Sequence, residues 1–272
     1  MKLFLPIFHQ LPIETGFGLR NPLHTRGLTK EPQVQVSLWK GFNLLAEKKI
    51  SFQGKDGIQC YLQDLFTDTE LKNAGIASVE FAVKDLSPSD KANLLGQSFE
   101  GQSFYRDATS KLGATILYDM IPDKKPGHIY SPILHSAHSA SVSDIHDTYA
   151  VLLNFRPPYL ETTEVQPMKI QTRGSNGKVL SESQTEIGFN ESLILSFKKE
   201  FKPFGGFESG CSLTFKGGKS QFAIFTLFRN EKTGALGIEH SLAPHYYVSA
   251  VANPVARKKF YENAFKGFRS TP

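Results

Sequence analysis

The sequence predicts an all-β protein that consists of two tandem antiparallel β-sandwiches of jelly-roll type, followed by one C-terminal helix. Three observations predict this fold. Residues 43–66 recur without a gap as residues 178–201, apolar and polar residues alternate along most segments, and the 272 residues include 22 Phe, 9 Tyr and 22 Gly. Alternation with a period of two is typical of strands with one buried face, and aromatic residues are enriched in strands. The chain is long enough for two domains of about 130 residues, each with its own core.

The repeated stretch organises the rest of the chain. When its two copies are laid over one another, Leu180 falls on Leu45 and Glu182 falls on Glu47. Each copy has the pattern of a strand, a short polar turn and a second strand, so we expect a duplicated β unit. Both glutamates lie on the polar side of their strands, where a solvated face is the expected environment. The repeat predicts architecture and does not by itself predict a biochemical activity.

The first sandwich is predicted to span residues 1–143. Its expected strands are residues 15–21, 34–38, 45–52, 58–62, 76–83 and 113–118. Gly41 and Asn43 suit the positive φ angles of a hairpin turn at residues 40–43. Residues 84–110 are predicted to be a polar insertion without a counterpart in the second copy, with a short helix over residues 88–96. Such an insertion serves either as a binding lid or as a surface excursion.

The second sandwich is predicted to span residues 144–252, after a linker rich in Ser, Asp and His near residues 139–147. Residues 174–177 have the composition of a hairpin turn, and the repeated unit at residues 178–201 follows them. The remaining expected strands are residues 149–154, 168–170, 211–215, 222–228 and 236–241.

The C-terminal residues 253–272 have a different pattern and predict an amphipathic helix with a short tail. Asn253 is a suitable N-cap, Pro254 suits the first helical position and Gly267 suits the end. Apolar residues recur every four positions, which gives the helix one apolar stripe. We expect this helix to dock over an open edge of a sandwich; contact within an oligomer and association with a membrane surface are the alternatives.

Composition and charge limit the partners. The net charge is +5, but Lys and Arg are scattered along the sequence, so a nucleic-acid partner is not favoured. The sequence has neither an apolar run long enough to span a membrane nor a complete signal-peptide pattern, which predicts a mature cytoplasmic protein. Cys60 and Cys211 fall in different copies, so we expect two free thiols in a reducing compartment in preference to a disulfide between the sandwiches.

The second copy resembles a known family. A strand ending in Asn154, an alternating strand, a Gly/Asn turn, the unit at residues 178–201, two more strands and the closing residues 238–241 follow the order of the sensory rhodopsin transducer family. In the first copy, Asn21 and His135 hold the equivalent places. The resemblance implies a cytoplasmic β-sandwich without catalytic residues, often oligomeric, that binds a ligand or relays a signal. This chain departs from the family by its two copies, its insertion and its C-terminal helix.

The histidines are the candidate site residues. His135 and His138 close the predicted first copy, and His240 and His245 close the second. If the two sandwiches pack pseudo-symmetrically, these loops bring four imidazoles together as ligand-binding residues. Four imidazoles are also enough for a zinc or copper site, although residues three or five apart on a strand point to opposite faces. The structural alternative is that these histidines only form hydrogen bonds at strand ends.

Motifs for catalysis are missing from the sequence. We find no glycine-rich phosphate loop, no paired cysteines at metal-ligand spacing and no nucleophile elbow. The leading hypothesis is therefore a non-enzymatic small-ligand-binding or signalling module, with a small molecule or a protein as its partner and a homo-oligomer as one form it takes. The alternative is a metal-dependent enzyme with a histidine-rich site between the two domains. The sequence identifies neither the ligand nor a cofactor.

Overall fold

The computed structural model describes residues 2–21, 33–53, 56–82, 100–119, 134–137, 142–155, 166–217 and 221–240. Its strands form four antiparallel sheets of four strands each, which confirms the predicted all-β fold. The jelly-roll assignment stays a prediction. Among the described residues, no helix has the length and apolar character needed to cross a membrane.

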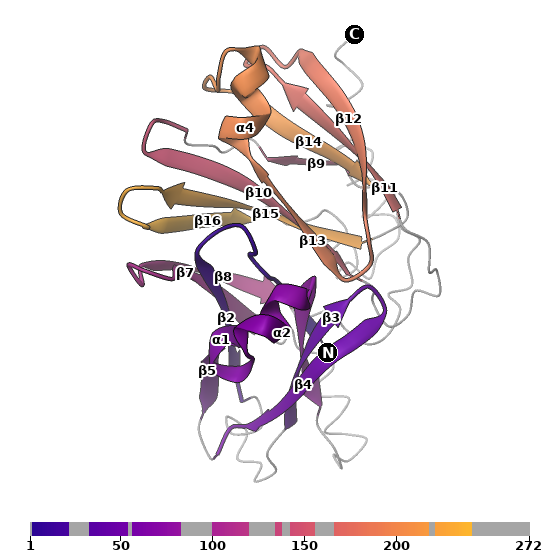
Figure 1. The fold of residues 1–272 in the computed structure, drawn as a ribbon, viewed down its shortest axis with the longest axis vertical. Coiled ribbons are helices and arrows are strands. Elements are labelled where there is room, and N and C mark those ends of the chain that lie inside the picture. Colours follow the sequence, from indigo (N-terminus) through magenta and orange to yellow (C-terminus); the bar gives the residue numbers. More distant parts are fainter. Residues whose placement is uncertain are drawn as a thin grey trace, which may run out of the picture.

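The first eight strands form two of the sheets (Figure 1). One sheet has the order β1-β6-β3-β4 and the other has the order β5-β2-β7-β8. The strands are β1 (Lys2–Pro6), β2 (Ile13–Arg20), β3 (Gln33–Lys40), β4 (Asn43–Ser51), β5 (Gly57–Tyr61), β6 (Ile76–Ala82), β7 (Glu100–Asp107) and β8 (Gly113–Asp119). We call these eight strands, with the helices between them, the first half.

The last eight strands repeat the same arrangement and form the second half. Their sheets have the orders β9-β14-β11-β12 and β13-β10-β15-β16. The strands are β9 (Leu134–Ala137), β10 (His146–Phe155), β11 (Gln166–Arg173), β12 (Val179–Ile187), β13 (Glu191–Ser196), β14 (Ser212–Gly217), β15 (Gln221–Asn230) and β16 (Leu236–His240). Each strand of the first half therefore has a counterpart eight strands later, and residues 43–66 and 178–201 occupy equivalent places.

The observed elements differ from the expected organisation at four places. Residues 2–6, which are not among the expected strands, form β1 and pair with β6. Residues 100–107, which we predicted to belong to a polar insertion, form β7, and β7 lies between β2 and β8 as the counterpart of β15. β9 precedes the predicted boundary at residue 143 but pairs with β14 of the second half. Residues 62–65, the end of the predicted strand 58–62 and its continuation, form a short helix. The predicted helices at residues 88–96 and 253–272 lie outside the described residues.

Both hairpins of the repeat have the same irregularity. Gly41 and Gly177 adopt positive φ angles of 58° and 77° in the turns between β3 and β4 and between β11 and β12, as the sequence predicts. Just after each turn the register shifts, and the residue left without a partner is Leu45 in one half and Leu180 in the other. These leucines are 42% and 39% exposed, and each lies on an edge strand. A bulge on an edge strand increases its twist and hinders edge-to-edge association.

Within the part of the chain that the structure describes, four short helical segments follow the edge strands. They are α1 (Leu62–Leu65), α2 (Asp68–Asn73), α4 (Phe197–Phe201) and the 3₁₀ segment η2 (Lys202–Phe204). Thr67 caps α2, because its hydroxyl accepts from the backbone N–H of Glu70 while the Glu70 carboxylate accepts from the backbone N–H of Thr67. These bonds hold the pKa of Glu70 below its ordinary value.

Each half has an apolar core between its sheets, and a third cluster joins the halves. This junction cluster contains Phe4, Ile13 and Tyr105 from the first half and Val151 and Phe225 from the second, all of them buried. The rings of Tyr105 and Phe225 stack with their centroids 5.4 Å apart. Figure 1 shows β7 and β8 lying opposite β15 and β16 at this junction. The two halves therefore bury one continuous apolar interface.

Polar contacts also cross the junction. Arg229 donates to Asp107 at 2.8 Å, Asn190 donates to the Gly41 carbonyl at 2.8 Å, and Ser192 donates to the Gly75 carbonyl at 3.2 Å. Hydrogen bonds to backbone carbonyls fix the loops of one half against the hairpin of the other.

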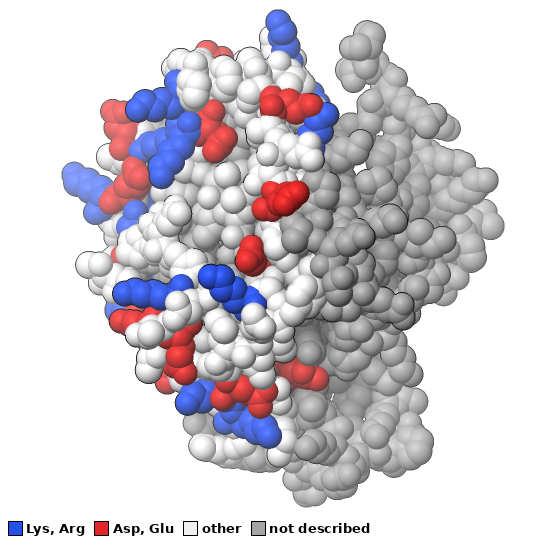
Figure 2. Space-filling model, turned by 45° about the vertical axis from the view of Figure 1, so that its right-hand side comes forward, with Lys and Arg blue, Asp and Glu red and all other residues white. Residues whose placement is uncertain are grey.

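Charged side chains are mixed over the described surface. Figure 2 shows Lys and Arg interspersed with Asp and Glu on the face it presents. Two exposed glutamates on edge strands also have hydrogen-bond partners on the neighbouring strand. Glu47 accepts a hydrogen bond from Gln35, and Glu182 accepts one from Gln171. Both glutamates lie on the solvated face that the sequence predicts.

Candidate functional site

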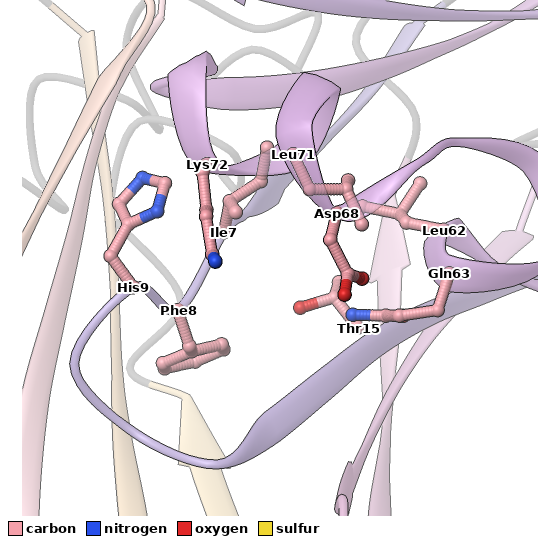
Figure 3. Close-up of a pocket in the computed structure, with 9 residues that line it drawn as sticks. All are labelled: Ile7, Phe8, His9, Thr15, Leu62, Gln63, Asp68, Leu71 and Lys72. Atoms are coloured by element: carbon pink, nitrogen blue, oxygen red, sulfur yellow. The ribbon is translucent and has the colours of Figure 1, made fainter.

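A pocket of about 160 Å³ lies in the first half, where the connection between β1 and β2 passes under α1 and α2. Figure 3 shows the side chains that surround it. Apolar residues form part of its wall, and the polar residues come from β2, α1, α2 and the connection between β1 and β2. Its lining consists of Ile7, Phe8, His9, Thr15, Leu62, Gln63, Asp68, Leu71 and Lys72.

Two leucines form the apolar floor of the pocket. Leu62 of α1 and Leu71 of α2 are 1% and 7% exposed, and both belong to the core of the first half. The capping interactions at Thr67 place the start of α2 and hence the position of Leu71. The floor of the pocket is therefore part of the core of the first half.

Two polar residues of the wall are held by the backbone. The Thr15 hydroxyl donates to the Pro6 carbonyl at 2.9 Å in a buried position. His9 Nε2 lies 2.8 Å from the Ala74 carbonyl oxygen. Because a carbonyl oxygen only accepts, His9 Nε2 carries the proton. Thr15 therefore presents oxygen lone pairs, and neither side chain is arranged as a nucleophile with an adjacent base.

Asp68 and Lys72 bring opposite charges to the same pocket. They are four residues apart on α2, a spacing at which an acidic and a basic side chain commonly pair. In the described structure, however, no ion pair joins them. Figure 3 shows the Lys72 ammonium and the Asp68 carboxylate pointing into the same space from different sides. Both charges are thus available to a bound molecule.

Gln63 adds an uncompensated polar atom. Its Oε1 is buried and has no hydrogen-bond partner among the described residues. A buried acceptor without a partner costs about 1–3 kcal/mol, and native proteins contain few of them. Figure 3 shows the amide nitrogen of Gln63 beside Thr15 and Asp68. Gln63 therefore offers an amide donor to the pocket, while its Oε1 is not accessible.

In the second half, aromatic rings pack at the positions that correspond to the two leucines of the floor. The repeat places Phe197 of α4 where the first half has Leu62, and the matching of β14 with β6 places Phe207 where it has Leu71. The ring centroids of Phe197 and Phe207 lie 5.9 Å apart, and those of Phe201 and Phe207 lie 5.4 Å apart. The same fold thus has leucines around a polar pocket in one half and packed phenylalanines in the other.

The predicted histidine site is only partly within the described residues. His135 lies in β9 opposite Phe215, and His240 lies at the end of β16 opposite Phe225. Both strands belong to the second half, so the two residues do not come one from each half. His138 and His245 lie outside the described residues. Among the described residues, no cluster of three or more His, Cys, Asp or Glu side chains is arranged to hold a metal ion. The metal site stays a prediction.

His146 has a structural role at the start of β10. Its Nδ1 lies 3.0 Å from the Ser143 hydroxyl, and its Nε2 lies 3.0 Å from the Asn230 amide nitrogen. Because the Asn230 amide nitrogen donates, Nε2 is the acceptor and Nδ1 carries the proton. His146 therefore donates to Ser143 and does not act as a base toward it.

The two cysteines are free, as the sequence predicts. Cys211 is buried and Cys60 is half-buried. Burial, together with the nearby Asp64 carboxylate, raises the pKa of the Cys60 thiol. This shift disfavours the reactive thiolate.

Comparison with known proteins adds no relative. No family model and no curated protein matches this chain. The resemblance to sensory rhodopsin transducer proteins therefore stays a prediction.

Sequence reasoning missed the pocket, because it read residues 58–62 as a strand and did not identify α1 or α2. A signal for α2 was present. Thr67 and Glu70 have the spacing of a capping box, which marks the start of a helix. With that helix assigned, Asp68 and Lys72 fall on one of its faces.

Proposed function

We propose that the protein is a non-enzymatic binding module that takes up a small polar molecule in the pocket beside α1 and α2. The observation that carries this proposal is the contrast between the two halves, because the same fold surrounds a polar pocket in one and packed rings in the other. Unfilled volume in a core destabilises the fold, so a cavity that is retained in only one of two equivalent halves indicates a function.

The lining supports binding more than catalysis. His9 and Thr15 are engaged with backbone carbonyls, and the charges of Asp68 and Lys72 are free of an ion pair with each other. Sites for small molecules combine apolar walls with a few polar groups that fix orientation. The pocket is smaller than the roughly 300–1,000 Å³ typical of sites for drug-sized ligands, so the ligand has few heavy atoms. A signalling role, a cytoplasmic location and an oligomeric form belong to the same proposal, and only the family resemblance supports them.

The experiment fills the pocket with the side chains of the other half. A Leu62→Phe/Leu71→Phe variant is compared with the native chain in saturation-transfer NMR against a set of small polar compounds. A Leu44→Phe/Leu112→Phe variant is the matched control, because it adds the same atoms at positions that are 47% and 49% exposed.

The proposal predicts at least one compound that binds the native chain and the control but not the filled variant. If no compound binds the native chain, or if the filled variant binds the same compounds equally well, the proposal is refuted. Should the filled variant fail to fold, Asp68→Ala and Lys72→Ala replace it, because both positions are exposed and their loss leaves the core intact.

A further inference from the structure

We infer that the ligand of this pocket is a small zwitterion, namely an α-amino acid with a side chain no larger than a few atoms. This inference rests on the proposed binding function and specifies its ligand. The geometry that points to it is the open pair on α2, where Asp68 and Lys72 flank one space with opposite charges and without an ion pair between them. A zwitterion brings one charge for each of them.

One side of the pocket presents hydrogen-bond acceptors. Asp68 contributes a carboxylate, and Thr15 contributes a hydroxyl oxygen whose own proton is donated to Pro6. Figure 3 shows these two side chains close together. An ammonium group has three donors and no acceptor. The carboxylate and the hydroxyl oxygen therefore match an ammonium group in kind.

The other side of the pocket presents a cation. Figure 3 shows the Lys72 ammonium across the pocket from the Asp68 carboxylate. A carboxylate of the ligand would accept from this ammonium in a charge-assisted hydrogen bond. A ligand with only a positive or only a negative charge would engage just one of the two α2 charges, whereas a zwitterion engages both.

Size and the apolar wall limit the side chain of the ligand. The volume of about 160 Å³ corresponds to roughly five water molecules at about 30 Å³ each. Phe8 and Leu71 contribute apolar surface between the two charged sides. Glycine, alanine and serine fit these limits, and amino acids with long or ring-shaped side chains do not.

The test compares alanine with two molecules that each lack one of its charged groups. Propionate is alanine without the ammonium group, and ethylamine is alanine without the carboxylate. Affinities are measured by titration calorimetry, or by NMR where binding is weak. We expect alanine to bind roughly tenfold or more tightly than either partial analogue, since a hydrogen bond to a charged group commonly contributes that much.

Two substitutions assign the charges. Asp68→Asn is expected to weaken alanine binding roughly tenfold and to leave propionate binding unchanged. Lys72→Met is expected to weaken alanine binding by a similar factor and to leave ethylamine binding unchanged. If alanine binds no better than propionate or ethylamine, or if Asp68→Asn leaves its affinity unchanged, the zwitterion inference is overturned.

The outcomes separate this inference from the proposed function. A partial analogue or another polar compound that binds the native chain at least as tightly as alanine, and is excluded by Leu62→Phe/Leu71→Phe, would overturn the zwitterion inference and leave small-ligand binding intact. If no compound, alanine included, binds the native chain and is excluded by that variant, both are overturned.

Discussion

Replacing Asp107 by Asn should destabilise the protein, because it removes the negative charge of the ion pair between Asp107 and Arg229, which joins the two halves. Asp107 is 2% exposed, and its Oδ2 accepts from Arg229 at 2.8 Å. Its Oδ1 accepts from the backbone N–H groups of Thr109 and Ser110 at 3.0 and 2.9 Å. Asparagine keeps an oxygen for the two N–H groups but places an amide donor against the Arg229 guanidinium.

The magnitude follows from the burial of both partners. Removing one partner of a buried ion pair costs about 3–5 kcal/mol, because the other charge is left uncompensated. The Arg229 side chain is 14% exposed, so water reaches part of it and we expect the lower end, about 3 kcal/mol. This is a large fraction of the roughly 5–15 kcal/mol that keeps a domain folded.

Urea unfolding measures this loss. Far-UV circular dichroism follows both halves, and the fluorescence of Trp39, the single tryptophan, follows the first half. The variant Asp107→Asn/Arg229→Met is the control, because it removes the guanidinium that Asp107→Asn leaves unpaired. We expect the free energy of unfolding of this double variant to exceed that of Asp107→Asn by at least about 1 kcal/mol. A loss below about 0.5 kcal/mol for Asp107→Asn, or a double variant no more stable than the single one, would refute the reasoning.

The same carboxylate predicts a dependence on pH. Burial on its own would raise the pKa of Asp107, but the N–H groups of Ser110 and Thr109 and the Arg229 guanidinium lower it below its ordinary value. The unfolded chain then takes up this proton at a higher pH than the folded chain does. The stabilisation is therefore complete above the ordinary pKa of about 3.9 and is lost as the pH falls through the folded pKa. In Asp107→Asn, the free energy of unfolding should fall less steeply over this acidic range.

Three further predictions concern packing, buried polarity and thiol reactivity. Gly16→Ala should destabilise by about 1–3 kcal/mol in urea unfolding, because its Cβ would lie 2.2 Å from the Phe104 ring. Gly18→Ala, whose nearest neighbour would lie at 3.5 Å, should change stability by less than about 0.5 kcal/mol; equal losses at the two glycines would contradict this account. Asn154→Ala should cost about 1–3 kcal/mol, because it removes a buried amide that donates to the carbonyls of Ile187 and Gly188 at the end of β12, and an unchanged urea midpoint would speak against this role. Alkylation of Cys60 by iodoacetamide should be slow at neutral pH and accelerate in more alkaline buffer than a free thiol requires, and a rate equal to that of a free thiol would disprove the raised pKa.

Most of the sheet architecture could be predicted from the sequence. The alternation of apolar and polar residues is a local signal for strands, and the repeated stretch shows this signal twice. Leu45 and Leu180 aligned correctly, and both proved to be the unpaired residues of equivalent bulges. β7 was missed because its outward positions are polar, and Gln102 and Arg106 make the segment resemble a surface loop. Its place between β2 and β8 is fixed by partners far away in the sequence.

The candidate site was harder to predict from the sequence. α1 has four residues, and its Leu62 continues the alternation of β5, so periodicity could not separate a helix from a strand. The pocket also depends on Thr15 and His9, which reach it from a different part of the chain. Only tertiary packing brings these residues together. The histidines attracted attention because they are chemically versatile, but His135 and His240 both lie in strands of the second half.

The junction cluster around Tyr105 and Phe225 limits how the two halves can move relative to each other. The halves cannot rotate against each other without exposing buried apolar area to water, at about 25 cal/mol per Å². A hinge motion between them is therefore costly. We expect the two halves to tumble in solution as one rigid body.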